Sequence, residues 1–447
     1  MKSNINLSSK SILATAIPVM LGSLIQFIIT FTDTAFLGRL GELALNTAGN
    51  SSLVYMTVLI SFQGFCEAYQ ILVAKFYGKK DFEEIKSLNQ RGILFFTGLG
   101  ILGFILFQFF SSVIISPVVT SLDLESSMIG YLEIRSWGFL PAMLQLMLVY
   151  YFMGMADTRI LSYAMLITAV TNIVLDYGLI FGKLGFPELG INGAAIATVI
   201  AESATFIFSL AYLIAHKKHR PIWFPLHKKY ILKFANKVLK KGSPLMVQRF
   251  FSMGGWTFFF IMLEVLGSQS LAASQIIRTL YFLAFIPVMG FSTTTRTFVS
   301  YFLSIGKPEL VKKGLYKISL LSLIATFIVI HGFWFYPEAI IGIITEDQEL
   351  IRVTSDIIGI ISYSMLIFAI ASIFFAAIAG IGDSSQSMFI EIFCLFSYLA
   401  LAYLVSHRWG GDVKDMWMLE FVYFSTLGII SFGYFKWYRW KTLEQKN

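Results

Sequence analysis

The chain alternates between long apolar runs and short polar stretches, and most apolar runs exceed the length of a core helix in a soluble domain. A helix needs about 20 predominantly apolar residues to cross the hydrocarbon layer of a membrane. Runs of this kind occur six times in each half of the chain and predict an all-α membrane protein with twelve transmembrane helices. The predicted spans are 11–37, 51–75, 92–116, 128–154, 160–181, 190–215, 242–266, 272–303, 314–336, 353–380, 386–406 and 415–435.

Composition agrees with lipid as the solvent of these helices. Of the 447 residues, 57% are hydrophobic and only 13% are charged, whereas soluble domains carry about 25% charged residues. A soluble chain of this length would need polar surface for two or three domains, and the charge is too scarce to supply it. Cys66 and Cys394 both lie inside apolar runs, so no disulfide framework is predicted.

The basic residues gather on one side of the predicted membrane topology. If the loops are assigned alternately to two sides, the side that holds both termini collects 25 of the 34 Lys and Arg. The positive-inside rule therefore predicts a multi-pass protein of the cytoplasmic (inner) membrane with both termini in the cytoplasm. The net charge of +8 is explained by this orientation, and we do not expect nucleic acid as a partner. The longest of these loops, 216–241, carries nine Lys and Arg and is predicted to be a cytoplasmic linker between the halves.

The two halves resemble each other when they are aligned at an offset of 226 residues. The longest local match pairs MGMADT (153–158) with AGIGDS (379–384). Each half contains an even number of helices, so both halves enter the membrane from the same side. The repeat predicts a first lobe at 1–215 and a second lobe at 242–447, arranged around a central cavity. The matched pairs are Pro18 with Pro244, Gly41 with Gly267, Leu45 with Leu271, Gly154 with Gly380 and Asp157 with Asp383.

Two acids within the predicted spans stand out because charge in the membrane is costly and marks functional sites. Asp33 and Asp176 lie on helices that run in the same direction, each about five residues before the outer end of its span. At 1.5 Å per residue both carboxyl groups lie roughly 7–8 Å below that end. Asn172 precedes Asp176 by one turn and shares its face, and Thr198 lies on the next helix at a depth of about 12 Å.

These polar residues break the internal repeat. At the offset of 226, Asp33 falls on Phe259, Asp176 on Ala402 and Asn172 on Tyr398. The proline and glycine positions are kept in both halves, so the acids indicate a chemistry that only the first lobe carries. Two neighbouring carboxylates in a low dielectric must take up a proton or bind a cation between them. The alternative is that Asp33 lies at the interface with water and that Asp176 bonds a neighbouring helix.

On these motifs the chain resembles the multidrug and toxic compound extrusion (MATE) transporters, and within them a DinF-like branch. The likeness covers essentially the whole chain and rests on Pro18, Gln26 and the run that begins at Asp33. It also rests on NIVLDYGLIFG (172–182) and GINGAAIATVIA (190–201). The resemblance implies that Asp33, Asn172, Asp176 and Thr198 form the coupling site for H⁺ or Na⁺. It further implies that Gln26 lines the cavity and that the first helix bends at Pro18.

The chain also departs from the family pattern. Tyr177 stands where the family commonly has proline, directly after the acid of the fifth helix. A NorM-like branch has acids in the second lobe, and the matching places here are Ser252 and Phe368. These departures put a second-lobe cation site in doubt. The remaining charged residues suggest an internal ionic network in that lobe; they are Arg249, Arg278 and Glu391.

The leading hypothesis is therefore a monomeric antiporter that exports organic, cationic or amphipathic compounds in exchange for H⁺ or Na⁺ by rocker-switch alternating access. The same oxygen ligands serve both ions, so the sequence leaves the coupling ion open, as it does the substrate. A flippase for a lipid-linked glycan is the alternative. An intramembrane enzyme is not favoured, because the five His residues form no metal or nucleophile motif, and no cofactor is expected.

Overall fold

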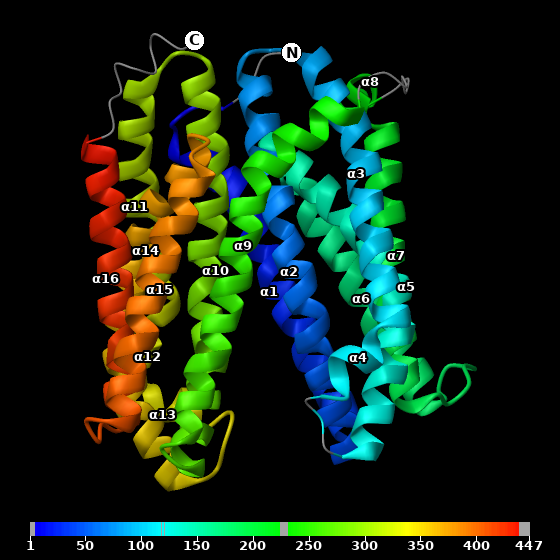
Figure 1. Cartoon of the computed structure of the whole chain (residues 1–447), viewed down its shortest axis with the longest axis vertical. Helices are drawn as coiled ribbons and strands as arrows, with labels where there is room; N and C mark the ends of the chain where they lie inside the picture. The colour runs from blue at the N-terminus through cyan, green and yellow to red at the C-terminus, as the bar shows by residue number, and fades with distance from the viewer. Residues whose placement is uncertain (1–4, 118, 120, 224–230, 438–447) are drawn as a thin grey trace. The chain divides into compact units, whose positions relative to one another are not determined.

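The structure of the chain is a computed structural model that describes residues 5–117, 119, 121–223 and 231–437. In these residues every regular element is an α-helix (Figure 1). The long helices are α1 (Ser9–Gly38), α2 (Glu42–Gly78), α3 (Phe82–Phe109), α5 (Leu122–Gly154), α6 (Arg159–Phe181), α7 (Gly190–Ala215), α9 (Ile231–Glu264), α10 (Ser268–Ser304), α11 (Pro308–Ile330), α14 (Gln348–Gly380), α15 (Ser384–His407) and α16 (Val413–Trp437). The short helices are α4 (Ser111–Ile115), α8 (Arg220–Trp223), α12 (Gly332–Phe335) and α13 (Pro337–Ile341).

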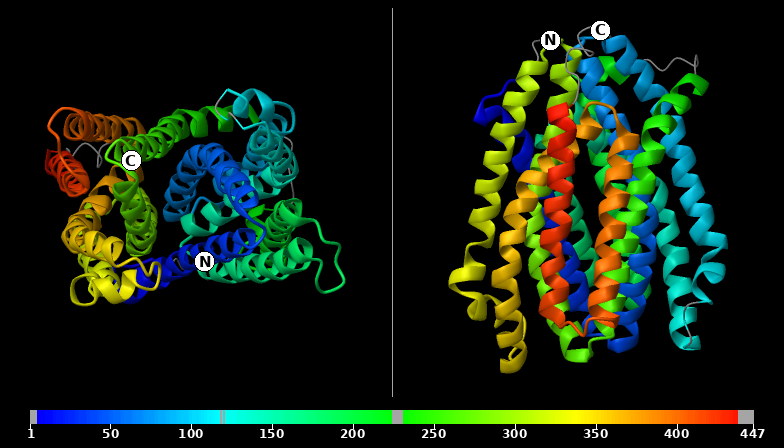
Figure 2. Two further views of the ribbon diagram at one scale, coloured as in Figure 1. Left: turned by 90° about the horizontal axis from the view of Figure 1, so that it is seen from below. Right: turned by 60° about the vertical axis from the view of Figure 1, so that its left-hand side comes forward.

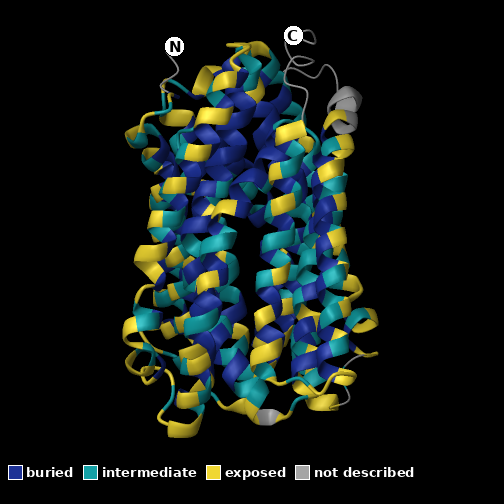
Figure 3. Ribbon diagram, turned by 90° about the vertical axis from the view of Figure 1, so that its left-hand side faces the viewer, coloured by how far each residue is buried: buried dark blue, intermediate teal, exposed yellow. Residues whose placement is uncertain are grey.

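The long helices confirm the predicted all-α membrane architecture. Among the described residues, 11 helices are long and apolar enough to cross a membrane. The remaining long helix, α9, begins before the predicted span 242–266 and ends at Glu264, and its first part carries several Lys residues. Buried and exposed positions recur along the helices (Figure 3), and many exposed positions carry large apolar side chains, as lipid-facing surfaces do.

Two glycines of the repeat have a shared structural role. Gly41 precedes α2 with φ 114°, and Gly267 precedes α10 with φ 102°. Residues with a side chain rarely adopt such a positive φ, whereas glycine adopts it at little cost because it has no Cβ atom. Both glycines therefore allow the chain to reverse between the first and second helices of each half, which explains why this pair is kept.

By their internal contacts the residues form two compact units, the first from Leu21–Met246 and the second from Met1–Met20 together with Val247–Asn447. This grouping differs from the predicted lobes, because the start of α1 belongs to the second unit and the segment 216–246 to the first. Both boundaries fall inside a helix, two residues after Pro18 in α1 and two residues after Pro244 in α9. A proline inside a helix removes a backbone hydrogen bond and favours a bend, so each change of unit follows a weak point in its helix.

Close helix contacts build each unit. In the first unit α5 packs against α2, α3 and α7, and α6 packs against α7. Glycines permit these approaches: a Cβ atom at Gly103 would lie 2.1 Å from the ring of Phe139. In the second unit α14 packs against α10, α11 and α16, and α15 packs against α16. Seen from the side, the long helices within each unit run roughly along one axis, and consecutive helices point in alternate directions (Figure 2, right).

The segment between α7 and α9 is more structured than the predicted linker 216–241. His219 is fully buried, its Nδ1 accepts from the Tyr151 hydroxyl at 3.0 Å, and its Nε2 donates to Asp157 Oδ2 at 3.2 Å. Lys218 donates to the same Asp157 oxygen at 2.9 Å. Ile222 and Trp223 of α8 are buried as well. The beginning of the predicted linker is therefore docked on the first unit, and α9 already begins at Ile231. Residues 224–230 lie outside the described residues.

The charge state of this anchor follows from its contacts. The hydrogen bond from His219 and the proximity of Lys218 hold the pKa of the Asp157 carboxyl well below its usual range. Burial lowers the pKa of His219, although Asp157 opposes that effect. His219 is therefore neutral at neutral pH, and Asp157 is ionised. The repeat partner Asp383 has a different environment, because it accepts from the Tyr434 hydroxyl at 2.6 Å.

Candidate intramembrane cation site

An apolar cluster near one end of the first unit fixes the relative depth of five helices. Its buried members come one or two from each of α1, α2, α5, α6 and α7. They are Leu37, Ala48, Tyr131, Ile180, Ala194 and Ala195. Helices α1 and α6 end near this cluster, whereas α2, α5 and α7 begin near it. The layer one helical turn deeper in the unit is therefore reached by going back four residues in the sequence on α1 and α6. On α2, α5 and α7 the same layer is reached by going forward four residues.

The layer one turn below this cluster is polar. Side chains four residues apart lie on the same face of a helix, about 6 Å apart along its axis. Every helix that contributes to the apolar cluster contributes a polar residue to the next layer. These residues are Asp33 on α1, Ser52 on α2, Arg135 on α5, Asp176 on α6 and Thr198 on α7. The first unit thus holds one polar layer from five helices beneath an apolar cap.

The structure brings Asp33 and Asp176 together within this layer. Their carboxyl groups lie within interaction distance of each other, and the Asn172 side chain lies within reach of Asp176. Aromatic contacts hold the two helices in register, since the Phe36 ring meets the Phe181 ring at 5.7 Å and the Tyr177 ring at 6.4 Å. Tyr177, the departure from the family pattern, therefore packs against α1 beside the acids.

Several polar atoms in this group have no hydrogen-bond partner within the described part of the chain. They are Asp33 Oδ1, Asp176 Oδ1 and both side-chain atoms Oδ1 and Nδ2 of Asn172. Asn172 and Asp176 are each 1% exposed. Buried polar groups are nearly always hydrogen-bonded, and leaving one unpaired costs about 1–3 kcal/mol. Carboxylate and amide oxygens suit a proton or a hard monovalent cation, so the residues fit such a ligand.

Thr198 is placed at the depth of the acids but is not joined to them by a hydrogen bond in the described structure. A Cβ at Gly193 of α7 would lie 2.5 Å from the Leu179 carbonyl oxygen of α6, and the Thr168 and Thr205 hydroxyls meet at 2.6 Å. Both contacts set Thr198 within about 3 Å of Asp176 along the helix axes. The Thr198 hydroxyl donates to the Ala194 carbonyl at 2.9 Å, so its oxygen retains lone pairs for a ligand.

Gln26 and Pro18 lie on α1 outside the polar layer. Gln26 precedes Asp33 by seven residues, which is nearly two turns, and therefore shares its face. Its side chain is exposed. Pro18 lies inside α1 in the part that belongs to the second unit.

Sequence reasoning missed an ion pair in the same layer. Arg135 of α5 donates from Nη2 to Glu202 Oε1 at 2.9 Å and from Nη1 to Glu202 Oε2 at 3.1 Å. The Arg135 side chain is only 5% exposed, and its partner lies on α7. The two residues are 67 positions apart, so no local spacing indicates the pair. The presence of one cation and one acid in different apolar spans is the only signal.

Buried acids of the second unit have different surroundings. Glu391 accepts from the Ser252 hydroxyl at 2.6 Å and from the Tyr423 hydroxyl at 2.9 Å. The positive charge of Arg249 also acts on Glu391. Glu420 accepts from the Tyr398 hydroxyl at 3.0 Å. The network suggested for this lobe therefore consists mainly of glutamates that accept from hydroxyl groups.

Arg278 of the second unit is stabilised by an aromatic ring. Its guanidinium carbon lies 5.1 Å from the centre of the Phe260 ring, a cation–π geometry.

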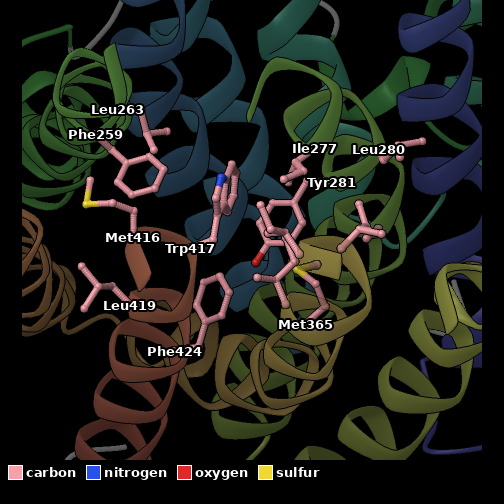
Figure 4. Packing of buried hydrophobic residues seen from close by; sticks show 14 of the residues in the cluster. Phe259, Leu263, Ile277, Leu280, Tyr281, Met365, Met416, Trp417, Leu419 and Phe424 are labelled. Carbon is pink, nitrogen blue, oxygen red and sulfur yellow. The ribbon is translucent and has the colours of Figure 1, made fainter. Parts of the chain in front are cut away.

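Where the first unit has its polar layer, the second has a hydrophobic core. At the offset of 226, the counterparts of the polar layer and of Asn172 lie almost entirely within one buried cluster. Trp417 fills its centre, 5.3 Å from the Phe259 ring and 5.7 Å from the Tyr281 ring (Figure 4). The counterparts of Asp33, Arg135, Asn172, Asp176 and Thr198 are Phe259, Ile361, Tyr398, Ala402 and Phe424. The counterpart of Ser52 is the exception, because it is Arg278, whose guanidinium lies over the Phe260 ring.

Two units of repeated sequence, with unpartnered buried acids in one of them, define a polytopic membrane transport protein. The chain belongs to the MatE family, because the family model described as MatE matches it twice, over residues 18–178 and 244–404. The two matches are offset by 226 residues at both ends, which confirms the repeat found in the sequence.

Relatives and solved structures agree with this assignment. The chain is 26% identical to a probable multidrug resistance protein NorM of Thermotoga maritima, over 98% of the chain and 95% of the relative. It is 23% identical to the probable multidrug resistance protein YoeA of Bacillus subtilis, over 95% and 92%. Its fold matches an outward-facing multidrug resistance MATE family transporter with a TM-score of 0.89 at 17% identity, over 97% and 96% of the two chains. A mutant of the Vibrio cholerae MATE transporter VcmN matches with a TM-score of 0.88 at 18% identity, over 97% and 98%.

Proposed function

We propose that the chain is a secondary antiporter that exports organic compounds in exchange for H⁺ or Na⁺ bound in the first unit. The observation that carries this proposal is the group of unpartnered buried atoms on Asp33, Asn172 and Asp176. Two carboxylates in a nonpolar interior are costly when both are ionised and unpaired. Uptake of a proton or a monovalent cation removes part of that cost, so occupancy of the site can bias the conformation of α1.

The order of events follows from this coupling. In an outward-open state, Asp33 and Asp176 take up the external cation. Neutralisation of the acids changes the contacts of α1, with Pro18 as the point of bending, and favours substrate release. Return to the inward-open state releases the cation to the cytoplasm. The transported compound and the cation thus move in opposite directions by alternating access of the rocker-switch type.

The substrate class is proposed from the relatives. The matching proteins from Thermotoga maritima and Bacillus subtilis are named as multidrug resistance proteins, which favours organic, cationic or amphipathic compounds over a lipid-linked glycan. We propose that the protein acts as a monomer in the cytoplasmic membrane with both termini in the cytoplasm. The distribution of Lys and Arg supports this orientation. The DinF-like branch remains a proposal that rests on Asp33 and Asp176.

The test is transport by the purified full-length chain in proteoliposomes, with H⁺ and Na⁺ gradients imposed separately. Ethidium serves as an aromatic organic cation whose movement is followed by fluorescence. The proposal expects ethidium movement against the direction of one imposed cation gradient, and no net movement when both gradients are collapsed. Equal ethidium movement with and without either gradient would refute antiport.

A further inference from the structure

The polar layer of the first unit contains a fixed positive charge as well as the acids. The two hydrogen bonds between the Arg135 guanidinium and the Glu202 carboxylate are both shorter than 3.2 Å, and each uses a different nitrogen and oxygen. The guanidinium carbon also lies 4.3 Å from the centre of the Tyr55 ring. Because arginine remains protonated in proteins, this site keeps its positive charge at every working pH.

The absence of a side chain at Gly138 makes room for this pair. A Cβ atom at Gly138 would lie 2.5 Å from Glu202 Oε2 and 3.2 Å from Arg135 Nη1. Gly138 therefore leaves room for the pair between α5 and α7. The Arg135 side chain is 5% exposed and that of Glu202 is 17% exposed, so water screens the charges little. A bidentate pair of this kind is directional and restricts the guanidinium more than a single contact would.

The charge of Arg135 reaches the candidate cation site. Arg135 lies in the same polar layer as Asp33 and Asp176, one turn from the cluster that fixes the depth of all three helices, so its positive charge acts on both acids. It acts as well on Tyr131, which lies one turn away on α5. The titratable or charged groups that face this region come from all five packed helices. They are Asp33 from α1, Tyr55 from α2, Tyr131 and Arg135 from α5, Asp176 from α6 and Glu202 from α7.

We propose that Arg135 is a positioning residue of the cation site, whose positive charge lowers the affinity of Asp33 and Asp176 for their cation. Glu202 holds the Arg135 guanidinium in place and prevents it from taking the position of that cation. The inference rests on the proposed coupling function of Asp33 and Asp176. Glu202 compensates most of the arginine charge, and the remaining field disfavours a second positive charge between the acids. The pair therefore keeps binding reversible, which an antiporter requires for cation release on the far side.

This arrangement predicts that two variants of the ion pair change the cation affinity of the acids in opposite directions. In Glu202→Gln the guanidinium loses its partner, its charge is uncompensated, and it competes directly with the cation. In the double variant Arg135→Gln/Glu202→Gln both charges are removed with little change in shape, and the acids lose their fixed neighbour. The single variant should weaken cation binding, and the double variant should strengthen it. A purely structural ion pair predicts no such reversal.

The experiment measures ethidium transport by the full-length protein in proteoliposomes against stepwise H⁺ concentration without Na⁺, and in a parallel series against Na⁺ at fixed pH. For Glu202→Gln, the half-saturating cation concentration should rise at least about tenfold, the effect of an opposite charge on a nearby carboxylate. For the double variant it should fall below that of the unmodified protein. The control is Glu133→Gln, which removes a partly exposed acid two residues from Arg135 and should leave the value unchanged.

Shifts of both variants in the same direction, or values equal to the unmodified protein, would overturn the inference. Should the double variant fail to reach the membrane, the comparison of Glu202→Gln with Glu133→Gln decides alone. Failure of the coupling proposal is a separate outcome, seen as normal cation-dependent transport in Asp33→Asn and Asp176→Asn. If those two variants lose transport while the Glu202 variants match the unmodified protein, only the role of Arg135 fails.

Discussion

The two units place buried carboxyl groups in different surroundings. In the first unit, Asp33 and Asp176 lie beside each other with unpartnered oxygens. In the second unit, Glu391 and Glu420 accept hydrogen bonds from Tyr423 and Tyr398. A buried acid that already has its donors contributes to packing, whereas an acid with free oxygens retains the capacity to bind a ligand. The comparison indicates that capacity for the first unit.

The same contrast holds at the level of the repeat. The positions that correspond to Asp33 and Thr198 are Phe259 and Phe424, which pack in the aromatic cluster around Trp417. One half of the repeat thus carries a polar layer, and the other carries a mainly apolar core at the matching positions.

The largest effect is expected for the acids themselves. Asp176→Asn removes a charged ligand, which corresponds to about 3 kcal/mol or a roughly 100-fold loss in cation affinity. Gradient-driven ethidium transport in proteoliposomes should therefore be abolished at normal protein level. The matched variant Glu391→Gln in the second unit should retain transport within a few-fold. Equal loss in both variants would remove the contrast between the units.

The aromatic core of the second unit is expected to affect stability rather than coupling. Trp417→Ala should cost about 3–5 kcal/mol, the usual cost of truncating a large buried aromatic residue. Thermal unfolding in detergent measures this loss. The cation concentration that half-saturates transport should not change, provided that the assay temperature lies below the lowered unfolding midpoint. A changed cation dependence would show that the core belongs to the coupling site.

A smaller effect on cation affinity is expected for Asn172, the neutral residue of the proposed site. Asn172→Ala removes one amide oxygen from the site, and we expect about a tenfold weaker cation affinity, equivalent to about 1.4 kcal/mol. Tyr398→Phe, at the matching position of the second unit, should leave cation affinity unchanged and lower stability by about 1 kcal/mol. Affinity is read from transport titrations and stability from thermal unfolding. An unaltered affinity in Asn172→Ala would exclude this residue from the site.

The smallest effect is expected for His219, which anchors the segment 216–223 to Asp157 of the MADT turn. Burial lowers the pKa of His219 from its ordinary value of 6.5, so the folded anchor holds neutral His219. The stability that this neutral form contributes is present above about pH 6.5 and declines as pH falls below it. Proteolysis within 216–223 should accelerate at pH 5.5 relative to pH 7.5. In His219→Asn this acceleration should disappear, whereas a persistent acceleration would assign it to another group.

Much of the fold was predictable from sequence because membrane helices carry their signal locally. Apolar run length indicated the spans, and the offset of 226 indicated the repeat. The common depth of Asp33 and Asp176 followed from their distance to the helix ends. The pairing of Arg135 with Glu202 did not follow, because it depends on how α5 packs against α7. The sequence did not predict that α1 and α9 each contribute residues to both units, because this division depends on the contacts made on either side of Pro18 and Pro244.

Cation binding to the purified full-length protein tests the central claim most directly. Proton binding is measured from the protons that the protein takes up or releases in weakly buffered detergent solution, and Na⁺ binding is measured by titration calorimetry at fixed pH. Neither measurement requires transport. The account predicts cation binding in the unmodified protein and in Glu391→Gln/Glu420→Gln. It predicts no binding in Asp33→Asn/Asp176→Asn. Retained binding in the first-unit double variant, with loss in the second-unit double variant, would contradict the assignment of the cation site to the first unit.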